Sequence, residues 1–238
     1  MIYILSDIHG NERRFNSIMD QIRLQPADTL YVLGDVLDRH PGGIRILRQI
    51  MAMPNVKMIL GNHEYMMLRA LGHPCDDNVD DGNAQPHWYR NGGQVTHDQF
   101  NQLPEDVRQE IVAYLHSLPL NIDLALNGNR YKLAHAAPAE AYDGDPRYKN
   151  PIYFSVWKRF DRGHTFPGDY TLIFGHTPTR YFQDRVPMAL WYGDRMIGID
   201  CGSGYPEAGE NSELGRLACL RLDDGKVFYS QEDFHEDL

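Results

Sequence analysis

The sequence has few cysteines and no hydrophobic run long enough to cross a membrane. Its 238 residues include only three cysteines, Cys75, Cys201 and Cys219. This odd, sparse set fits a reducing compartment better than a disulfide framework. Residues 1–6 are apolar but short and lack a basic lead, so we expect a strand there and no signal peptide. The sequence therefore predicts a cytoplasmic protein with no membrane partner.

Positive charge is also scarce. The chain has 23 Lys and Arg against 33 Asp and Glu, a formal net charge of −10. Because no run of Lys or Arg is present, we expect no nucleic-acid polymer as a partner. An acidic protein can still bind an anionic substrate, because bound divalent cations can be the largest local charges in a site.

Apolar runs alternate with amphipathic segments in the N-terminal part of the chain. Residues 2–6, 29–33 and 56–60 predict three buried strands, and apolar residues at helical spacing follow each of them. Pro26 and Pro54 end the first two helices. Short links between strands and helices are typical of a layered α/β domain with much parallel sheet.

The rest of the chain predicts one helix and several short strands. The helix spans residues 104–116, and the strands are 121–126, 130–134, 171–174 and those near 195–200, 215–222 and 226–230. Between about 72 and 101 the composition turns polar, which predicts a cap-like insertion outside the core. Within it, Trp88 and Tyr89 could lean over a site or pack the cap down. With no repeat or linker, we expect residues 1–238 to form one domain.

Polar residues follow each of the first three strands. Asp7 and His9 come after residues 2–6; Asp35, Asp38 and Arg39 come after 29–33; Asn62 and His63 come after 56–60. Any one of these clusters could be an ordinary turn or helix N-cap. Because parallel strands present their carboxyl ends at one edge of a sheet, three in succession favour a shared site.

Two later histidines also follow apolar strands. His135 comes after residues 130–134 and His176 after 171–174. Each could be a hydrogen-bonded core histidine, but small residues or Pro come next and leave room for a ligand. We expect the remaining histidines to lie at the surface or in the cap: His40, His73, His87, His97, His116, His164 and His235.

Six of these side chains could hold metal ions: Asp7, His9, Asp35, Asn62, His135 and His176. Carboxylate, imidazole and amide ligands without cysteine suit Mn²⁺, Fe or Zn²⁺. Six ligands are too many for one tetrahedral zinc with an open position. They fit two ions that share Asp35, an arrangement that activates water in phosphoryl chemistry. Asp38 and Arg39 would lie further out, suited to orienting an acid and binding an oxyanion.

The motifs resemble those of the calcineurin-like metallophosphoesterases in order and spacing. The resemblance runs from residue 6 to about 179 and rests on Asp7-x-His9-Gly10, Gly34-Asp35-x-x-Asp38-Arg39, Gly61-Asn62-His63-Glu64, His135 and Gly175-His176. Bacterial phosphoprotein phosphatases are the most similar branch. Three further motifs are similar to that branch: Asn91-Gly92-Gly93, Trp157-x-Arg159 and Ile199-Asp200-Cys201-Gly202.

The resemblance implies a central β-sandwich flanked by helices, with a dinuclear metal site at the strand ends. One ion would be held by Asp7, His9 and Asp35, and the other by Asp35, Asn62, His135 and His176. A bridging hydroxide would attack phosphorus in line, with Mn²⁺ the favoured ion and Fe, Zn, Ni or Mg as alternatives. Arg39 and Arg159 would hold the phosphate, and His63, oriented by Asp38, would protonate the leaving oxygen.

Two substrate classes follow from this resemblance. Glu64 and the Asp38-Arg39 pair favour a serine/threonine protein phosphatase, with a phosphoprotein as its substrate. The phosphatase pattern usually has Arg before Gly-Asn-His and Gly after Asp-Arg, whereas this chain has Leu60 and His40. At the Leu60 position the chain resembles the symmetrical dinucleoside tetraphosphate hydrolases. A dinucleoside polyphosphate or another small phosphorylated metabolite is therefore the alternative substrate. A non-enzymatic binding module on this fold would lack a ligand or the acid, and neither is missing.

Overall fold

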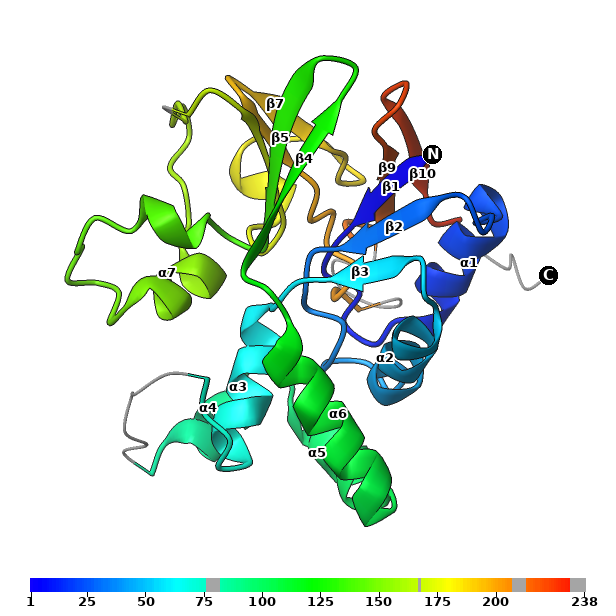
Figure 1. Ribbon diagram of the computed structural model, residues 1–238, viewed down its shortest axis with the longest axis vertical. Helices are drawn as coiled ribbons and strands as arrows, with labels where there is room; N and C mark the ends of the chain where they lie inside the picture. Colours follow the sequence, from blue (N-terminus) through cyan, green and yellow to red (C-terminus); the bar gives the residue numbers. More distant parts are fainter. Residues whose placement is uncertain (76–81, 167, 207–212, 232–238) are drawn as a thin grey trace.

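Two five-stranded β-sheets form the centre of the protein in a computed structural model that describes residues 1–75, 82–166, 168–206 and 213–231 (Figure 1). The first sheet has the order β10-β9-β1-β2-β3, and the second has the order β4-β5-β6-β8-β7. The strands are β1 (Ile2–Leu5), β2 (Thr29–Val32), β3 (Val56–Met58), β4 (Asn121–Leu126), β5 (Asn129–Ala134), β6 (Thr171–Phe174), β7 (Trp191–Gly193), β8 (Met196–Gly198), β9 (Ala218–Arg221) and β10 (Lys226–Tyr229).

Helices flank the two sheets. They are α1 (Glu12–Ile22), α2 (Gly43–Ala52), α3 (Asn62–Ala70), α4 (Ala84–Arg90), α5 (Gln94–Asn101), α6 (Glu105–Ser117) and α7 (Pro151–Trp157), with short 3₁₀ turns η1 (Ala139–Ala141) and η2 (Thr179–Tyr181). Of these helices, α1 and α2 pack on the first sheet. None of the described helices has both the length and the apolar character needed to span a membrane. The predicted layered α/β fold, a sandwich of two sheets flanked by helices, is confirmed.

Strand direction brings the carboxyl ends of six strands together. In the first sheet β1, β2 and β3 run parallel, and in the second β5, β6 and β8 run parallel. The other strands pair antiparallel at the edges or, for β9, beside β1. Loops that follow parallel strands leave the sheet on the same side, which is where open α/β folds form their sites.

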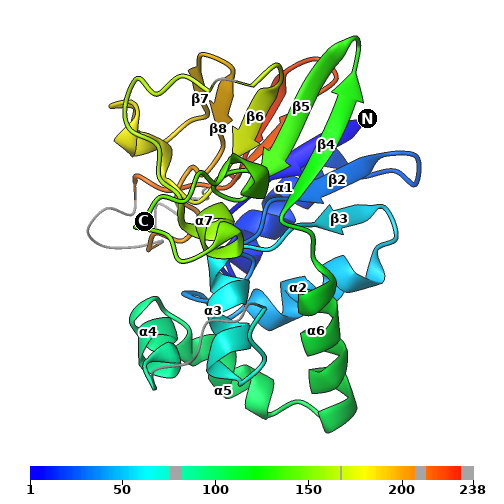
Figure 2. The ribbon, with the colours of Figure 1, turned by 60° about the vertical axis from the view of Figure 1, so that its left-hand side comes forward.

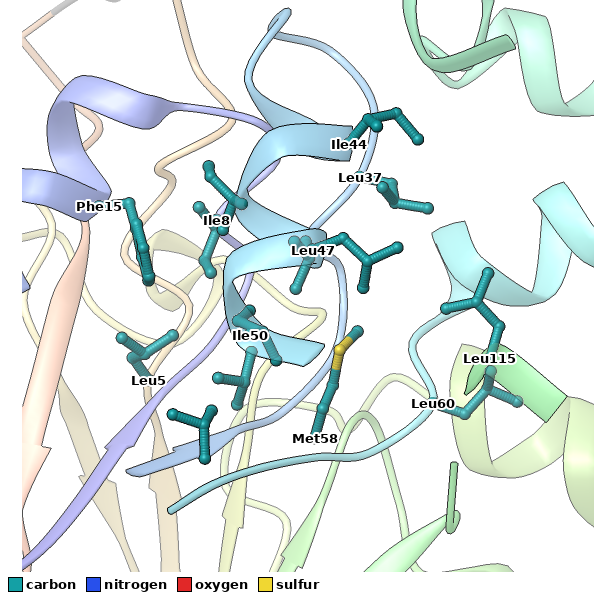
Figure 3. Close-up of a cluster of buried hydrophobic side chains, with 14 of the residues drawn as sticks. Leu5, Ile8, Phe15, Leu37, Ile44, Leu47, Ile50, Met58, Leu60 and Leu115 are labelled. Carbon is teal, nitrogen blue, oxygen red and sulfur yellow. The ribbon is translucent and has the colours of Figure 1, made fainter. Parts of the chain in front are cut away.

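Alternation along β1 explains how the sheets and helices pack. Tyr3 and Leu5 face the helices and join the larger hydrophobic cluster, whereas Ile4 faces the second sheet and joins the cluster between the sheets. Figure 3 shows Leu5 near Phe15 of α1 and Ile50 of α2 in the helix-side cluster. The apolar residues of both strand faces are buried, as expected for a sheet covered on two sides.

The polar stretch from 72 to 101 contributes to the core, contrary to the expectation from its composition. It forms α4 and α5, and Trp88 and Phe100 are 0% and 5% exposed within the helix-side cluster. Each of these short helices carries one large buried residue among polar neighbours, so the sequence showed no hydrophobic period. Residues 76–81 of this stretch, and His235, lie outside the described residues.

Candidate active site

The predicted site residues converge on one cavity at the carboxyl ends of the parallel strands. The residues follow β1 (Asp7, His9), β2 (Asp35, Asp38, Arg39), β5 (His135), β6 (His176) and α7 (Arg159), or begin α3 after β3 (Asn62, His63). The cavity measures about 290 Å³ and is lined by eight of these ten: Asp7, His9, Asp35, Arg39, Asn62, His63, Arg159 and His176. The other two, Asp38 and His135, are fully buried behind it.

The backbone of these loops is strained. Six non-glycine site residues have φ between 51° and 72°, in the left-handed region: Asp7, His9, Asp35, Asp38, Arg39 and His176. Such conformations cost on the order of 1–3 kcal/mol each and persist where surrounding structure holds them. Glu64 supplies part of that support, because its buried carboxylate accepts hydrogen bonds from the backbone N–H of Asp35 at 2.8 Å and Val36 at 2.9 Å. The same carboxylate accepts from the Gly61 N–H at 3.2 Å.

A close contact also joins the two sheets at the site. The backbone N–H of His176, after β6, donates to Asp7 Oδ2, after β1, at 3.0 Å. Gly175 makes this approach possible, since a Cβ atom there would lie 2.1 Å from Ser6 Oγ and 2.2 Å from Asp7 Oδ2. A side chain at position 175 would therefore push the two loops apart.

Asp35 lies at the centre of the ligand set. Its Oδ1 is 3.4 Å from His135 Nε2, and its Oδ2 is 3.7 Å from His9 Nε2 and 3.8 Å from His63 Nε2. Asn62 Oδ1 lies 2.9 Å from His135 Nε2 and 2.8 Å from His176 Nδ1. Oxygen and nitrogen donors from both sheets thus face one another around this single carboxylate.

The hydrogen bonds of two histidines fit cation binding. His135 Nδ1 lies 2.6 Å from the Leu33 carbonyl oxygen, and His9 Nδ1 lies 3.2 Å from the Leu37 carbonyl oxygen. A carbonyl can only accept, so each ring donates its one N–H there and turns an unprotonated Nε2 toward Asp35. Metal-binding histidines are commonly oriented by a second hydrogen bond of this kind. The donor set therefore fits divalent metal ions.

Burial keeps these imidazoles neutral. It lowers the pKa of His135, and it lowers the pKa of His9 and of His176 well below their usual value. Arg39 lowers the pKa of His9 further, and His135 does so for His176. Burial, followed by the charges of Asp200 and Asp35, raises the pKa of Asp7. Neutral imidazoles are the form that binds metal ions.

His63 has a different environment. Its Nδ1 donates to Asp38 Oδ2 at 2.6 Å, and its Nε2 faces the cavity, 3.3 Å from Arg39 Nη2. Burial by itself lowers the pKa of His63, but the Asp35 charge and the Asp38 hydrogen bond outweigh it and raise the pKa overall. An imidazole held in this orientation can donate a proton from Nε2 when it is protonated there.

Trp88 is a site residue that sequence reasoning left undecided. Its indole N–H donates to Asp38 Oδ2 at 2.8 Å, the same oxygen that accepts from His63. The Asp38 backbone N–H in turn donates to Thr96 Oγ1 at 3.0 Å. Trp88 therefore packs the polar stretch down and also holds the carboxylate that orients His63. Only its aromatic character marked it in the sequence.

Asp200 also lines the cavity, although it was not among the predicted site residues. It is 4% exposed, and burial raises its pKa to about 6. The sequence does mark Asp200 as a site residue, because it ends the predicted strand 195–200 and belongs to a motif similar to that of the phosphatases. Tyr181 and Tyr205 line the same cavity, and the Arg159 guanidinium lies over the Tyr181 ring at 5.7 Å.

Known proteins with related sequences include nucleotide hydrolases. A symmetrical bis(5'-nucleosyl)-tetraphosphatase of Aromatoleum aromaticum is 28% identical over 148 residues, which is 61% of this chain and 47% of that protein. The chain thus spans about half the length of this curated relative.

Solved structures share the fold at low identity. A protein proposed to be a diadenosine tetraphosphatase superposes with a TM-score of 0.63 and 19% identity, covering 96% of this chain and 91% of that one. A protein serine/threonine phosphatase from Saccharomyces cerevisiae gives a TM-score of 0.52 with 14% identity, covering 100% and 81%. These likenesses concern the fold alone.

A family model matches most of the chain. The model of the calcineurin-like phosphoesterase family matches residues 1–199, which include the six predicted metal ligands and His63. The chain therefore belongs to the calcineurin-like phosphoesterase family.

Proposed function

We propose that this chain hydrolyses dinucleoside polyphosphates of the diadenosine tetraphosphate type. Family membership makes it a metal-dependent hydrolase of phosphoesters. The observation that carries the substrate class is the match of 61% of the chain to a symmetrical bis(5'-nucleosyl)-tetraphosphatase. The chain spans about half of that relative, so its substrate is part of the proposal.

Leu60 argues against the phosphoprotein substrate that the motifs favoured. The phosphoprotein phosphatases usually carry Arg at this position. Leu60 is 3% exposed and packs in the helix-side cluster near Leu115 (Figure 3). It therefore adds no positive charge to the cavity, where Arg39 and Arg159 are the two lining arginines among the described residues.

Two divalent ions fit the donor set. Asp7, His9 and Asp35 would hold one ion, while Asp35, Asn62, His135 and His176 would hold the other. When bound, such ions activate water and supply positive charge for the phosphate oxygens. Mn²⁺ is our expected ion, because the set mixes oxygen donors with imidazole and contains no thiolate.

The other side chains would bind the phosphate and move the proton. Arg39 and Arg159 line the cavity, where their planar guanidinium groups would hold phosphate oxygens. His63 would give its Nε2 proton to the leaving oxygen, while Asp38 keeps Nδ1 protonated. Trp88 would fix the Asp38 carboxylate through its indole N–H.

Product analysis tests this function. Metal-stripped protein reloaded with Mn²⁺ is incubated with diadenosine tetraphosphate and, in parallel, with a phosphoserine/phosphothreonine peptide. We expect turnover of the dinucleotide to two molecules of ADP at a kcat/KM well above that for the peptide. Asp7→Asn is the matched control and should lose metal and activity together. Faster release of phosphate from the peptide would overturn the proposal and support a protein phosphatase.

A further inference from the structure

A second cavity lies beside the catalytic one and is lined mainly by residues of α3, α4 and α7. Figure 2 shows the arrangement of these three helices. It measures about 160 Å³ and is lined by Tyr65, Met66, Arg69, Asn83, Ala84, His87, Arg90, Lys149, Tyr153 and Trp157. Trp157 belongs to the walls of both cavities. The centroid of its indole ring lies 5.7 Å from that of the His87 ring and 5.6 Å from that of the His176 ring. A ligand that extends past Trp157 from the catalytic cavity would enter this second one.

Four of the ten residues that line the second cavity carry aromatic rings. Tyr153 stacks on Trp157 at 6.0 Å with an interplanar angle of 29°, and Tyr65 meets Tyr153 edge-on at 6.1 Å. Burial, followed by the charge of Arg90, lowers the pKa of His87, which leaves that ring neutral near pH 7. Such a wall suits a flat ring system, because aromatic side chains stack on every nucleobase.

An unused hydrogen-bond donor adds to this chemistry. The indole Nε1 of Trp157 is buried and has no hydrogen-bond partner among the described residues. A buried N–H without a partner is destabilising, because it has lost its hydrogen bonds to water without replacement. An acceptor atom on a bound ligand would satisfy it.

The same wall is positively charged. Arg69, Arg90 and Lys149 line it, and no carboxylate among the described residues does. Neither Arg90 nor Lys149 forms an ion pair with another described residue. In a chain of net charge −10, three cations on one cavity wall mark a local field that attracts anions.

We propose that this second cavity binds one nucleotide end of the dinucleotide. The nucleobase lies against Tyr153 and Trp157, and its phosphates reach back along Arg90 and Lys149 toward the catalytic cavity. This inference rests on the proposed function and assigns the residues that distinguish a dinucleotide from a simple phosphomonoester. The cavity offers a partner for both parts of this nucleotide: aromatic rings for the base and cationic side chains for the phosphates.

Charge reversal at the cavity tests the phosphate contacts. The double variant Arg90→Glu/Lys149→Glu is compared with Arg48→Glu/Lys57→Glu, which reverses two exposed charges on α2 and β3. For Mn²⁺-loaded proteins, KM is measured with diadenosine tetraphosphate and with p-nitrophenyl phosphate, which has no nucleotide end. In the cavity variant we expect the ratio of the two KM values to rise at least tenfold over that of the control. Equal ratios in the two variants would overturn the inference while leaving the proposed function intact.

Equilibrium binding separates the two proposals if the dinucleotide is not turned over. ADP and inorganic diphosphate are titrated into the Mn²⁺-loaded wild type, the cavity and control variants, and Tyr153→Leu, whose fold is checked by circular dichroism. We expect ADP to bind more tightly than diphosphate, and Tyr153→Leu to reduce that preference about tenfold. If the cavity variant binds ADP more weakly than the control variant does, this result supports the site even without turnover. No ADP binding by the wild type, or no preference for ADP over diphosphate, overturns it.

Discussion

At the scale of single residues, His63 and His135 show how the same side chain meets two different environments in one site. His135 places its Nδ1 proton on the Leu33 carbonyl, which is uncharged, and burial lowers its pKa. His63 places the same proton on the Asp38 carboxylate, and the nearby charges raise its pKa despite burial. The group behind the ring therefore decides whether the imidazole offers a lone pair or a proton.

This difference gives a prediction for His63→Asn. The variant should keep both metal ions, because the proposed ligands are unchanged, and should lose the proton donor. We expect kcat to fall by roughly 10²–10⁴, the usual contribution of a positioned acid. Steady-state kinetics and metal content by plasma mass spectrometry measure the two effects separately.

His135→Asn is the matched comparison, because it changes a proposed ligand in the same way. It should lose metal and activity together. If His63→Asn emptied the site as well, His63 would be a ligand and its assignment as the acid would be wrong.

At the scale of elements, the site depends on two loops from different sheets that meet without a side chain between them. The Cβ of Gly175→Ala would lie 2.2 Å from Asp7 Oδ2, so the loops after β1 and β6 must separate. We expect the free energy of unfolding to fall by about 1–3 kcal/mol, the usual cost of overpacking. Mn²⁺ affinity should fall too, because the proposed ligands Asp7 and His176 would be displaced relative to one another. Urea denaturation and metal titration provide the measurements.

Gly198→Ala is the control for this prediction. A Cβ there would have its first neighbour at 3.5 Å, an ordinary contact, and the position lies in β8. Its stability should change little, and its Mn²⁺ affinity should equal that of the wild type. Equal losses in both variants would show that glycine is needed for reasons other than the loop contact.

The sequence was informative where a site residue directly follows an apolar strand. Asp7, Asp35 and His176 each come within three residues of the end of a buried strand, so predicting the strands also predicted the positions of these residues. Trp88 could not be placed this way, because it reaches Asp38 across 50 residues from a polar stretch with no hydrophobic period. The strand β7 and the helix α7 were missed for a similar reason: both are short and depend on packing with distant residues.

At the scale of the whole molecule, the proposed metal centre links the two sheets. Its ligands come from loops after β1 and β2 in the first sheet, from the start of α3, and from loops after β5 and β6 in the second. Without bound cations, burial and neighbouring groups of the same kind disfavour the charged forms, which raises the pKa of Asp7 and lowers the pKa of His176. Bound ions should therefore stabilise the packing of the sheets as well as supply chemistry.

Removal of metal should lower the melting temperature. With free Mn²⁺ at about 100 times its dissociation constant, binding stabilises the folded state by about 2.7 kcal/mol per site. For a chain of this size each kcal/mol corresponds to roughly 2–4 °C, so one site should contribute about 5–10 °C. Differential scanning calorimetry of chelator-treated protein, with and without added Mn²⁺, measures the shift, and Asp7→Asn should show a smaller one.

Acidification should reduce this stabilisation. Burial lowers the pKa values of His9, His135 and His176, so at pH 7.5 their rings are already neutral and protons do not compete with metal. Asp7, whose pKa burial raises, keeps its proton to a higher pH than an ordinary carboxyl group. As pH falls, protons therefore compete with metal at Asp7 and at the imidazoles. We expect the Mn²⁺-dependent rise in melting temperature to be smaller at pH 5 than at pH 7.5, and an equal rise at both would contradict the proposed ligand set.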